Sequence, residues 1–212
     1  MRTDSFTLAI IQNSLIGIAR DMKIMTMRTA YTQLWKEQGD LSCCLMDANG
    51  EIIAQDPNGF PIHVTTMPLQ LQGLIESIGS KNLFEGDVLI TNDPFLGGTH
   101  LPDVLIARPL FFEDNIYAYA CNRGHWADIG GMGPGSYSPS TSEIYQEGIL
   151  IPPVKLFEKG DIITDKMGYN MCVAIDGAGF IVIALENKKP DPKDPPCSLT
   201  MTQNSVWTRT GC

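Results

Sequence analysis

A short polar break between two apolar runs constrains the centre of this chain more than any other feature. Asp103 to Phe112 is largely apolar and ends in two aromatic residues, and Ile116 to Cys121 is again apolar and aromatic. The break between them is Glu113-Asp114-Asn115, a polar turn of the kind that joins antiparallel strands. If the turn centres on its middle residue, Asp103 faces His125 at the open end of the hairpin, with Cβ atoms about 5 Å apart.

His100 lies three residues before Asp103, so this hairpin gathers two imidazoles and one carboxylate at one end. The donor set suits Zn²⁺ or Mn²⁺, and also Fe²⁺. Glycines flank both histidines and let the backbone approach a ligand closely, although glycine is also common in loops. The alternative is a pair of histidines that only satisfy local hydrogen bonds, because H-x-x-D alone is a weak pattern. The candidate metal ligands are therefore His100, Asp103 and His125.

Other polar residues could serve the same site. Asp128 follows His125 by three residues, and we predict that it orients an imidazole or acts as a general base. Glu143 and Glu147 could face the site as acid or base, although solvated glutamates are the default interpretation. His63 is interpreted as structural or substrate-lining rather than as a ligand.

Several long motifs around these residues resemble those of the hydantoinase B family. They are, in order along the chain, TNDPFLGGTHLPD, NRGHWADIGG, STSEIYQEG and IPPVKLF. The resemblance covers roughly Asp4 to Asp161. Members of the family include 5-oxoprolinases, caprolactamase, and the acetone and acetophenone carboxylases.

This resemblance implies a further ligand and a partner. Metal-binding members are expected to use an aspartate in the context D-[FL]-S-C, which corresponds to Asp40 here. A hydantoinase A-like (HyuA-like) ATPase subunit, of the actin/hexokinase type, phosphorylates the substrate with ATP, and the metal subunit then completes the reaction. This chain contains no phosphate-binding P-loop motif of its own. A hetero-oligomer is therefore expected.

Three functions remain open at this point. The resemblance favours the metal subunit of an ATP-dependent cyclic-amide hydrolase of the hydantoinase, oxoprolinase or lactamase type, whose metal activates water or the substrate carbonyl. The second is the equivalent subunit of an ATP-dependent ketone carboxylase acting on acetone or acetophenone. The third is an inactive truncated remnant or binding module, because family members are much longer.

Composition excludes several other classes of protein. Apolar residues make up 43 % of the chain and charged residues 18 %, which is typical of a globular protein. The net charge of −9, without a basic run, argues against a nucleic-acid partner. No apolar run reaches the roughly 18 residues needed to span a bilayer, and the first residues form no secretory signal. Scattered cysteines without a C-x-x-C motif favour reduced thiols, so we expect a cytoplasmic protein.

The expected fold is α+β, with N-terminal helices packed on a mixed, largely antiparallel sheet of hairpins. Asp4 or Ser5 caps a first helix, whose apolar stripe should pack on the core. Its members recur at spacings of three and four: Leu8, Ile11, Leu15, Ile18, Met22 and Met25. Asn49-Gly50 predicts a hairpin turn after a strand that begins at Leu41. A second helix is expected to be capped by Thr66, with Pro68 in its first turn.

The chain is expected to divide near residue 163. Residues 1–163 form the metal-binding catalytic region, which is truncated relative to the family, and residues 164–212 form a divergent tail. Within the tail, Val173 to Asp176 and Phe180 to Leu185 predict a hairpin across Gly177. The stretch ENKKPDPKDPPCS is rich in proline and mixed in charge, which is typical of a linker or a disordered segment.

Overall fold

The computed structural model describes residues 4–136, 138–162, 170–175, 181–186, 198–201 and 207–210. The chain divides into two compact units, Met1–Asp161 and Ile162–Cys212. The predicted boundary after residue 163 falls in a stretch outside the described residues, and so does most of the proline-rich segment; both stay predictions. None of the described helices is long and apolar enough to cross a bilayer.

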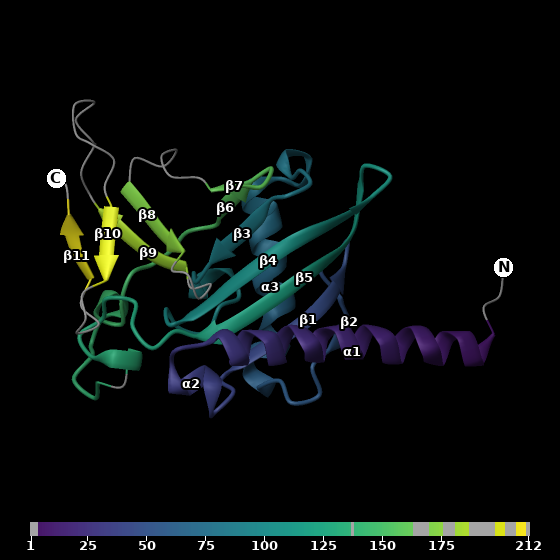
Figure 1. Cartoon of the computed structure of the whole chain (residues 1–212), viewed down its shortest axis with the longest axis horizontal. Coiled ribbons are helices and arrows are strands. Elements are labelled where there is room, and N and C mark those ends of the chain that lie inside the picture. Colours follow the sequence, from purple (N-terminus) through teal and green to yellow (C-terminus); the bar gives the residue numbers. More distant parts are fainter. Residues whose placement is uncertain are drawn as a thin grey trace. The chain divides into compact units, whose positions relative to one another are not determined.

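A seven-stranded sheet forms the first unit (Figure 1), in the order β2-β1-β5-β4-β3-β6-β7. Its strands are β1 Leu41–Asp47, β2 Ile52–Gln55, β3 Val88–Thr91, β4 Asp103–Phe112, β5 Asn115–His125, β6 Val154–Glu158 and β7 Asp161–Ile162. Every pairing with a described register is antiparallel. The prediction of an α+β fold built on hairpins is confirmed.

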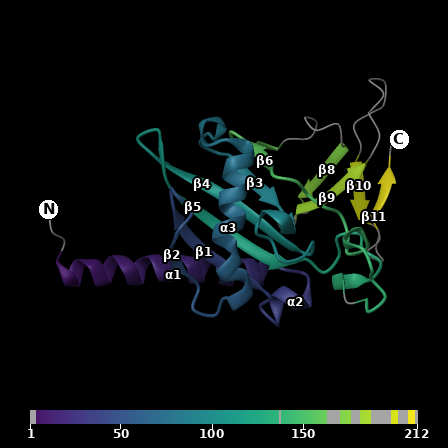
Figure 2. The same cartoon turned by 180° about the vertical axis from the view of Figure 1, so that it is seen from behind.

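Three α-helices accompany this sheet: α1 Ser5–Thr29, α2 Gln33–Lys36 and α3 Pro61–Ile78. Short 3₁₀ turns follow at η1 Ser80–Asn82, η2 Pro94–Leu96, η3 Pro134–Ser136 and η4 Ile144–Gln146. Neighbouring cysteines of β1 point to opposite faces of the sheet. Asn122 of β5 bridges Cys43 to Thr26 of α1, whereas the Cys44 sulfur lies 3.9 Å from that of Met67 in α3. The two long helices therefore cover opposite faces, as Figures 1 and 2 show.

The hydrophobic core lies between α3 and the sheet. Met67, Leu71 and Leu74 of α3 are fully buried against apolar side chains from four strands. Those strand residues include Cys44, Met46, Leu89, Leu105, Ala107, Tyr119 and Cys121. Burying each leucine stabilises the fold by roughly 1.5–3 kcal/mol. This core holds the N-terminal turns of α3 against the open end of the β4–β5 hairpin.

Helix α1 differs from its prediction. Asp4 caps it as expected, accepting hydrogen bonds from the backbone N–H groups of Phe6 and Thr7 at 3.0 Å. The predicted stripe, however, is largely exposed: Leu8 by 58 % and Ile11 by 47 %. Figure 1 shows these N-terminal turns extending past the edge of the sheet. The buried residues of α1, Ala19 and Lys23, both lie in its C-terminal half, and Lys23 forms an ion pair with Asp56 at 3.2 Å.

The β4–β5 hairpin has the predicted register at its open end, where Asp103 pairs with His125. Its turn is shorter than predicted: Phe112 pairs with Asn115, so only Glu113 and Asp114 lie between the strands, both with positive φ. An irregularity next to Phe111 adds one residue to β5 and restores the expected pairing.

Helix α3 begins five residues before the predicted cap at Thr66. Pro61 occupies its first turn, where its missing N–H costs nothing, and Pro68 lies inside the helix. The prediction was wrong because two prolines seven residues apart both suit a first turn. As a result His63 belongs to the helix and is buried.

Two hairpins make up the described part of the second unit. Strand β8 (Asn170–Ile175) pairs antiparallel with β9 (Ile181–Glu186), so the strands predicted there are confirmed, while their connection lies outside the described residues. Strand β10 (Ser198–Met201) pairs with β11 (Trp207–Thr210).

Candidate metal centre

Three neighbouring segments bring the candidate ligands together at the open end of the β4–β5 hairpin. Asp103 is the first residue of β4 and His125 the last of β5, so the sheet itself places them side by side. His100 precedes β4 in a turn closed by the Asp103 N–H, which donates to the His100 carbonyl oxygen at 3.1 Å. The prediction that this end of the hairpin gathers all three residues is confirmed as a matter of geometry.

The donor atoms converge on one point. His100 Nε2 lies 2.9 Å from Asp103 Oδ1 and 3.2 Å from His125 Nδ1, and the third side of this triangle, from His125 Nδ1 to Asp103 Oδ1, is 3.4 Å. Among the described His, Cys, Asp and Glu residues, these three form the group whose ligand atoms all lie within 4.8 Å of one another.

These separations fit a divalent cation. Ligands about 2.0–2.1 Å from a tetrahedral Zn²⁺ lie about 3.3 Å apart, close to the three distances observed. Two imidazole nitrogens and one carboxylate oxygen favour Zn²⁺, Mn²⁺ or Fe²⁺ over Mg²⁺ or Ca²⁺, which prefer oxygen ligands alone. Asp103 and His125 are only 3 % exposed, whereas His100 is more exposed. Water could therefore reach a cation held here from the side of His100 but not from the side of the other two residues.

The electrostatics of the cluster keep its carboxylate ionised. Burial by itself raises the pKa of Asp103, but hydrogen bonds from His100, His125, His63 and Thr99 together hold that pKa well below its usual range. For His125, burial lowers the pKa, whereas Asp103, Asp40 and the Gly135 carbonyl raise it, and the net shift is upward. The site is therefore already polarised to hold positive charge.

A backbone carbonyl orients the His125 ring. Its Nε2 lies 3.2 Å from the carbonyl oxygen of Gly135, which can only accept a hydrogen bond. Nε2 therefore carries a proton in either charge state. When the ring is protonated, Nδ1 also carries one and can donate to Asp103; when the ring is neutral, its lone pair is on Nδ1, the atom that faces His100 and Asp103. The indole N–H of Trp35 in α2 also donates to the His125 carbonyl at 2.6 Å and fixes the end of the strand.

Asp40 and His63 lie beside the cluster. Asp40 precedes β1, and its carbonyl accepts the His125 N–H at 3.1 Å. Its carboxylate is 3.8 Å from His63 Nε2, which is also 3.3 Å from Asp103 Oδ2. Asp40 is thus next to the centre but outside the group of three, and its role as a ligand stays a prediction.

Asp128 lies close in sequence but has a local partner. Its Oδ1 accepts the Gly130 N–H at 2.8 Å, and it is not among the residues that line the described pocket next to His100. Its predicted role as base or orienting residue stays a prediction. Burial, together with neighbouring Cys44 and Asp56, raises the pKa of the Cys43 thiol to about 12, so this thiol is protonated at neutral pH.

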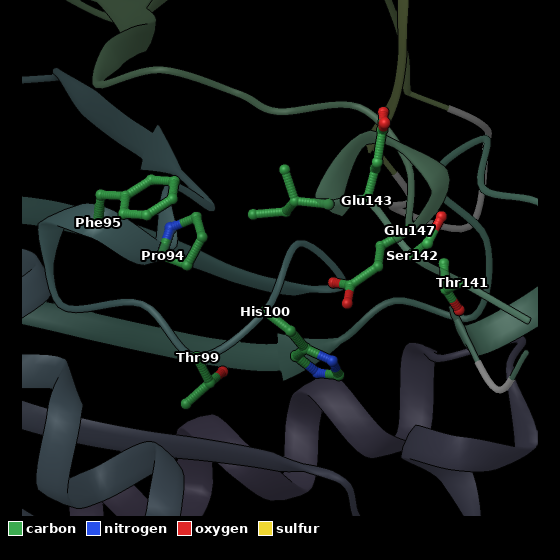
Figure 3. A pocket seen from close by; sticks show the side chains of 9 residues that line it. Pro94, Phe95, Thr99, His100, Thr141, Ser142, Glu143 and Glu147 are labelled. Carbon is green, nitrogen blue, oxygen red and sulfur yellow. The ribbon is translucent and has the colours of Figure 1, made fainter. Parts of the chain in front are cut away.

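A pocket of about 390 Å³ opens on the exposed side of His100 (Figure 3). Its lining consists of Pro94, Phe95, Thr99, His100, Thr141, Ser142, Glu143, Ile144 and Glu147. The Glu147 carboxylate is directed towards the His100 ring and accepts the Leu101 N–H at 3.3 Å, whereas Glu143 is directed away. The volume is sufficient for a small organic substrate.

Sequence reasoning missed Arg123. His63, interpreted as structural or substrate-lining rather than as a ligand, lies outside the group of three, and its role stays a prediction. Arg123 lies two residues before His125 on the same strand, so the alternation of side chains already puts both on one face. It is fully buried, with its guanidinium 3.8 Å from Asp103 Oδ2. For His63, no signal in the sequence connects α3 with the hairpin.

The fold and the cluster define a class: α+β chains in which one hairpin presents a His–Asp–His donor set to a small pocket. The sequence pattern of the family described as hydantoinase B/oxoprolinase matches residues 4–174. The chain belongs to this family.

Relatives in sequence are much longer than this chain. An uncharacterized protein of Methanocaldococcus jannaschii is 37 % identical over 161 residues, which is 75 % of this chain and 28 % of the relative. The 5-oxoprolinase 1 of Arabidopsis thaliana is 37 % identical over 157 residues, 74 % of this chain and 12 % of that protein. The chain therefore spans about a quarter or less of the relatives it matches.

Solved structures share the fold. The ATP-dependent caprolactamase of Pseudomonas jessenii matches with a TM-score of 0.69 and 32 % identity, covering 76 % of this chain and 28 % of the other. The nucleotide-free structure of acetone carboxylase matches with a TM-score of 0.66 over 73 % of this chain and 21 % of the other. Because its identity is 24 %, this second likeness concerns the fold alone.

Proposed function

We propose that this chain is the metal-binding portion of the metal subunit of an ATP-dependent cyclic-amide hydrolase. The observation that carries the proposal is the convergence of three donor atoms, from His100, Asp103 and His125, within 3.4 Å of one another. A divalent cation, Zn²⁺, Mn²⁺ or Fe²⁺, would be held by these residues, with Asp40 as a further ligand. The chemistry that it supplies is Lewis acidity, which makes water more acidic or polarises a carbonyl.

The residues around the pocket suit a small neutral ring. Ile144 and Phe95 offer apolar surface, while Thr141 and Ser142 offer hydroxyl groups that can hydrogen-bond an amide. Glu147 lies on the pocket side of His100 and is held by the Leu101 N–H. In the proposed reaction Glu147 takes the proton of the attacking water or passes one to the leaving nitrogen. Asp128 remains the alternative base.

The hydrolase is preferred over the ketone carboxylase because of the relatives. The caprolactamase is 32 % identical to this chain, whereas acetone carboxylase supports the fold alone. A hydantoinase A-like ATPase subunit is the proposed partner, since the similar caprolactamase chain is named subunit beta and that enzyme is ATP-dependent.

In this proposal the partner transfers a phosphoryl group from ATP to the substrate carbonyl oxygen. Glu147 would deprotonate a water that adds to the same carbon, the ring C–N bond would break, and a second water would release phosphate. His100, Asp103 and His125 would hold the cation, which would supply Lewis acidity to this attack.

Elemental analysis of the purified chain tests the metal site. After exposure to Zn²⁺, Mn²⁺ or Fe²⁺ and dialysis, we expect about one equivalent of one of these metals per chain. His100→Ala and Asp103→Ala should lose it, and Asp40→Asn should weaken retention less than either. A wild-type chain that takes up none of the three metals contradicts the proposal.

Reconstitution tests the reaction. The chain is combined with a hydantoinase A-like ATPase subunit and supplied with ATP and either hydantoin, 5-oxoproline, acetone or acetophenone, with and without bicarbonate. The hydrolase predicts ATP turnover with a cyclic amide that does not depend on bicarbonate. Turnover only with a ketone and bicarbonate supports the carboxylase instead, and a metal-loaded chain inactive with every combination supports a binding module.

A further inference from the structure

A fully buried arginine lies behind the candidate centre. Arg123 is among the largest fully buried side chains in the described part of the chain. Burial lowers its pKa, and the neighbouring Asp103 carboxylate raises it, with a net downward shift. Removing a guanidinium from water costs free energy unless its donors are satisfied, so the placement calls for a physical reason.

Two threonine hydroxyls accept hydrogen bonds from the Arg123 guanidinium. Nη1 donates to Thr66 Oγ1 at 2.5 Å, and Nη2 donates to Thr99 Oγ1 at 2.7 Å. Thr66 belongs to α3, and its own hydroxyl hydrogen goes to the Ile62 carbonyl at 2.9 Å. Arg123 therefore ties the open end of the hairpin to a helix that the core holds rigidly in place.

The direction of the network is settled by hydrogen counting. A threonine hydroxyl has one hydrogen, and that of Thr99 is donated to Asp103 Oδ2. Thr99 can therefore only accept from Arg123, and the polarity runs from Arg123 through Thr99 to Asp103. Each donor strengthens the next one along such a chain.

The two oxygens of Asp103 have different surroundings. Oδ1 faces His100 Nε2 at 2.9 Å and His125 Nδ1 at 3.4 Å. Oδ2 is occupied by the Thr99 hydroxyl, with His63 Nε2 at 3.3 Å and the Arg123 guanidinium at 3.8 Å. Rotating the carboxylate about its Cβ–Cγ bond would break all three contacts of Oδ2.

We propose that Arg123 is a positioning residue, which acts through Thr99 to fix the Asp103 carboxylate so that Oδ1 alone is presented to a divalent cation. The inference rests on the proposed function, because it requires that the three donors bind a metal. Arg123 is neither among the residues that line the pocket nor among the three candidate ligands. It is fully buried, and its planar fork is what allows one side chain to hold two hydroxyls in fixed directions.

Removing the Arg123 guanidinium could change metal affinity in two opposite directions. A guanidinium close to the centre repels a cation, so removing it would raise metal affinity if repulsion dominated. Loss of the network frees the carboxylate to rotate, and changes to such supporting residues typically lower metal affinity by about 10–100-fold. The positioning role predicts the second result.

The experiment uses the intact chain with Co²⁺ and Zn²⁺ as probes. Metal affinity is measured by chelator competition, and the geometry of the site by the visible spectrum of bound Co²⁺. Arg123→Met and Thr99→Val should each lower affinity about 10–100-fold and change the Co²⁺ spectrum. The double variant should be little worse than either single variant, because both break the same relay. Arg123→Lys should restore only part of the affinity, since lysine cannot hold both hydroxyls.

Lys23→Met is the matched control, because Lys23 is a second buried cation, paired with Asp56 at 3.2 Å on the opposite face of the sheet. It should lower thermal stability but leave Co²⁺ binding and its spectrum unchanged. Thr99→Val keeps the test decisive if Arg123→Met fails to fold. Unchanged or higher affinity in both variants, or additive losses, overturns the positioning role while leaving the metal site intact. A wild-type chain that binds neither metal overturns the proposed function and this inference with it.

Discussion

The two ends of the β4–β5 hairpin belong to the same pair of strands but differ in how far their side chains are exposed. At the turn end, Glu113 and Asp114 have positive φ, and Phe112 and Tyr117 are exposed by 67 % and 55 %. At the open end, Asp103, Arg123 and His125 are at most 3 % exposed, although all three are polar. Strand pairing alone therefore does not decide where a hairpin becomes a site.

What separates the ends is the cover that other elements supply. The open end is enclosed by the first turns of α3, through His63 and Thr66, and by Trp35 of α2. Asp103, Arg123 and His125 each have specific partners there, although the Arg123 Nε has none among the described residues, so removing one of these side chains leaves another buried group unpaired. The turn end carries no such dependence. Substitutions of the same kind should therefore have large effects at one end and small ones at the other.

The largest effect is expected for His125→Ala. Loss of an imidazole ligand should lower the affinity for Zn²⁺ at least about 100-fold, more than any change to a supporting residue. Phe112→Ala, at the exposed turn end, should bind Zn²⁺ as the wild type does. Isothermal titration of both variants checks this difference; equal affinity would mean that His125 is no ligand.

Gly124→Ala should destabilise the open end by about 1–3 kcal/mol, because a methyl group there would lie 2.8 Å from the Trp35 ring. The displaced indole would also disturb its hydrogen bond to the His125 carbonyl. Gly133→Ala is the control, since no atom lies within 4 Å of a methyl group at that position. Urea denaturation measures both, and a neutral Gly124→Ala would show that Trp35 moves freely.

The pH dependence of the metal-free protein should depend on the open end. The pKa of Asp103 is lowered on folding, so its contribution is present above pH ~3.9 and is lost as the pH falls further. The pKa of His125 is raised, so its contribution is complete below pH ~6.5 and is lost as the pH rises through the raised value. The size of each contribution depends on how far the pKa of the group differs between the folded and the unfolded chain. A difference of one pKa unit, which is a tenfold difference in proton affinity, corresponds to about 1.4 kcal/mol of unfolding free energy.

Asp103→Asn should flatten both limbs of this profile, because asparagine does not titrate and no longer holds the His125 proton. Phe112→Ala should keep both limbs. Unfolding free energies measured from pH 3 to 9 test the difference. A profile for Asp103→Asn that follows the wild type at every pH would place the dominant titrating groups elsewhere.

The smallest effect is expected at the turn itself. Replacing Glu113-Asp114 by Asn-Gly should stabilise the chain by at most about 1 kcal/mol. Both positions have positive φ, which asparagine and glycine tolerate best, but the greater freedom of glycine in the unfolded chain offsets part of the gain. Metal affinity should not change. Thermal denaturation with and without Zn²⁺ measures both quantities, and altered metal affinity would mean that the two ends are coupled.

Local patterns were enough for several elements. Alternating apolar residues around a polar break predicted the hairpin, and Asn49-Gly50 predicted the turn between β1 and β2. The facing of Asp103 and His125 was correct although the turn was misjudged by one residue, because the irregularity next to Phe111 compensates. A bulge of this kind depends on strand twist and has no clear signal in a single sequence.

Helix packing could not be predicted in the same way. The periodicity of α1 correctly indicated a helix but not the face that meets the sheet, where Lys23 lies in place of the predicted apolar stripe. The start of α3 was misplaced because Pro61 and Pro68 both suit a first turn. Since His63 and Thr66 reach the centre only through α3, their roles were hidden as well.

The sequence by itself determined the hairpin, its open-end register and the three donor residues, because turn chemistry and side-chain alternation act over a few neighbouring positions. Only the tertiary structure decided that Arg123, Thr99 and Thr66 form one network behind Asp103. Those contacts join residues up to 57 positions apart. They exist because burial of the core places α3 against the hairpin. Sequence patterns that act over a few neighbouring residues cannot predict a contact between residues so far apart in the chain.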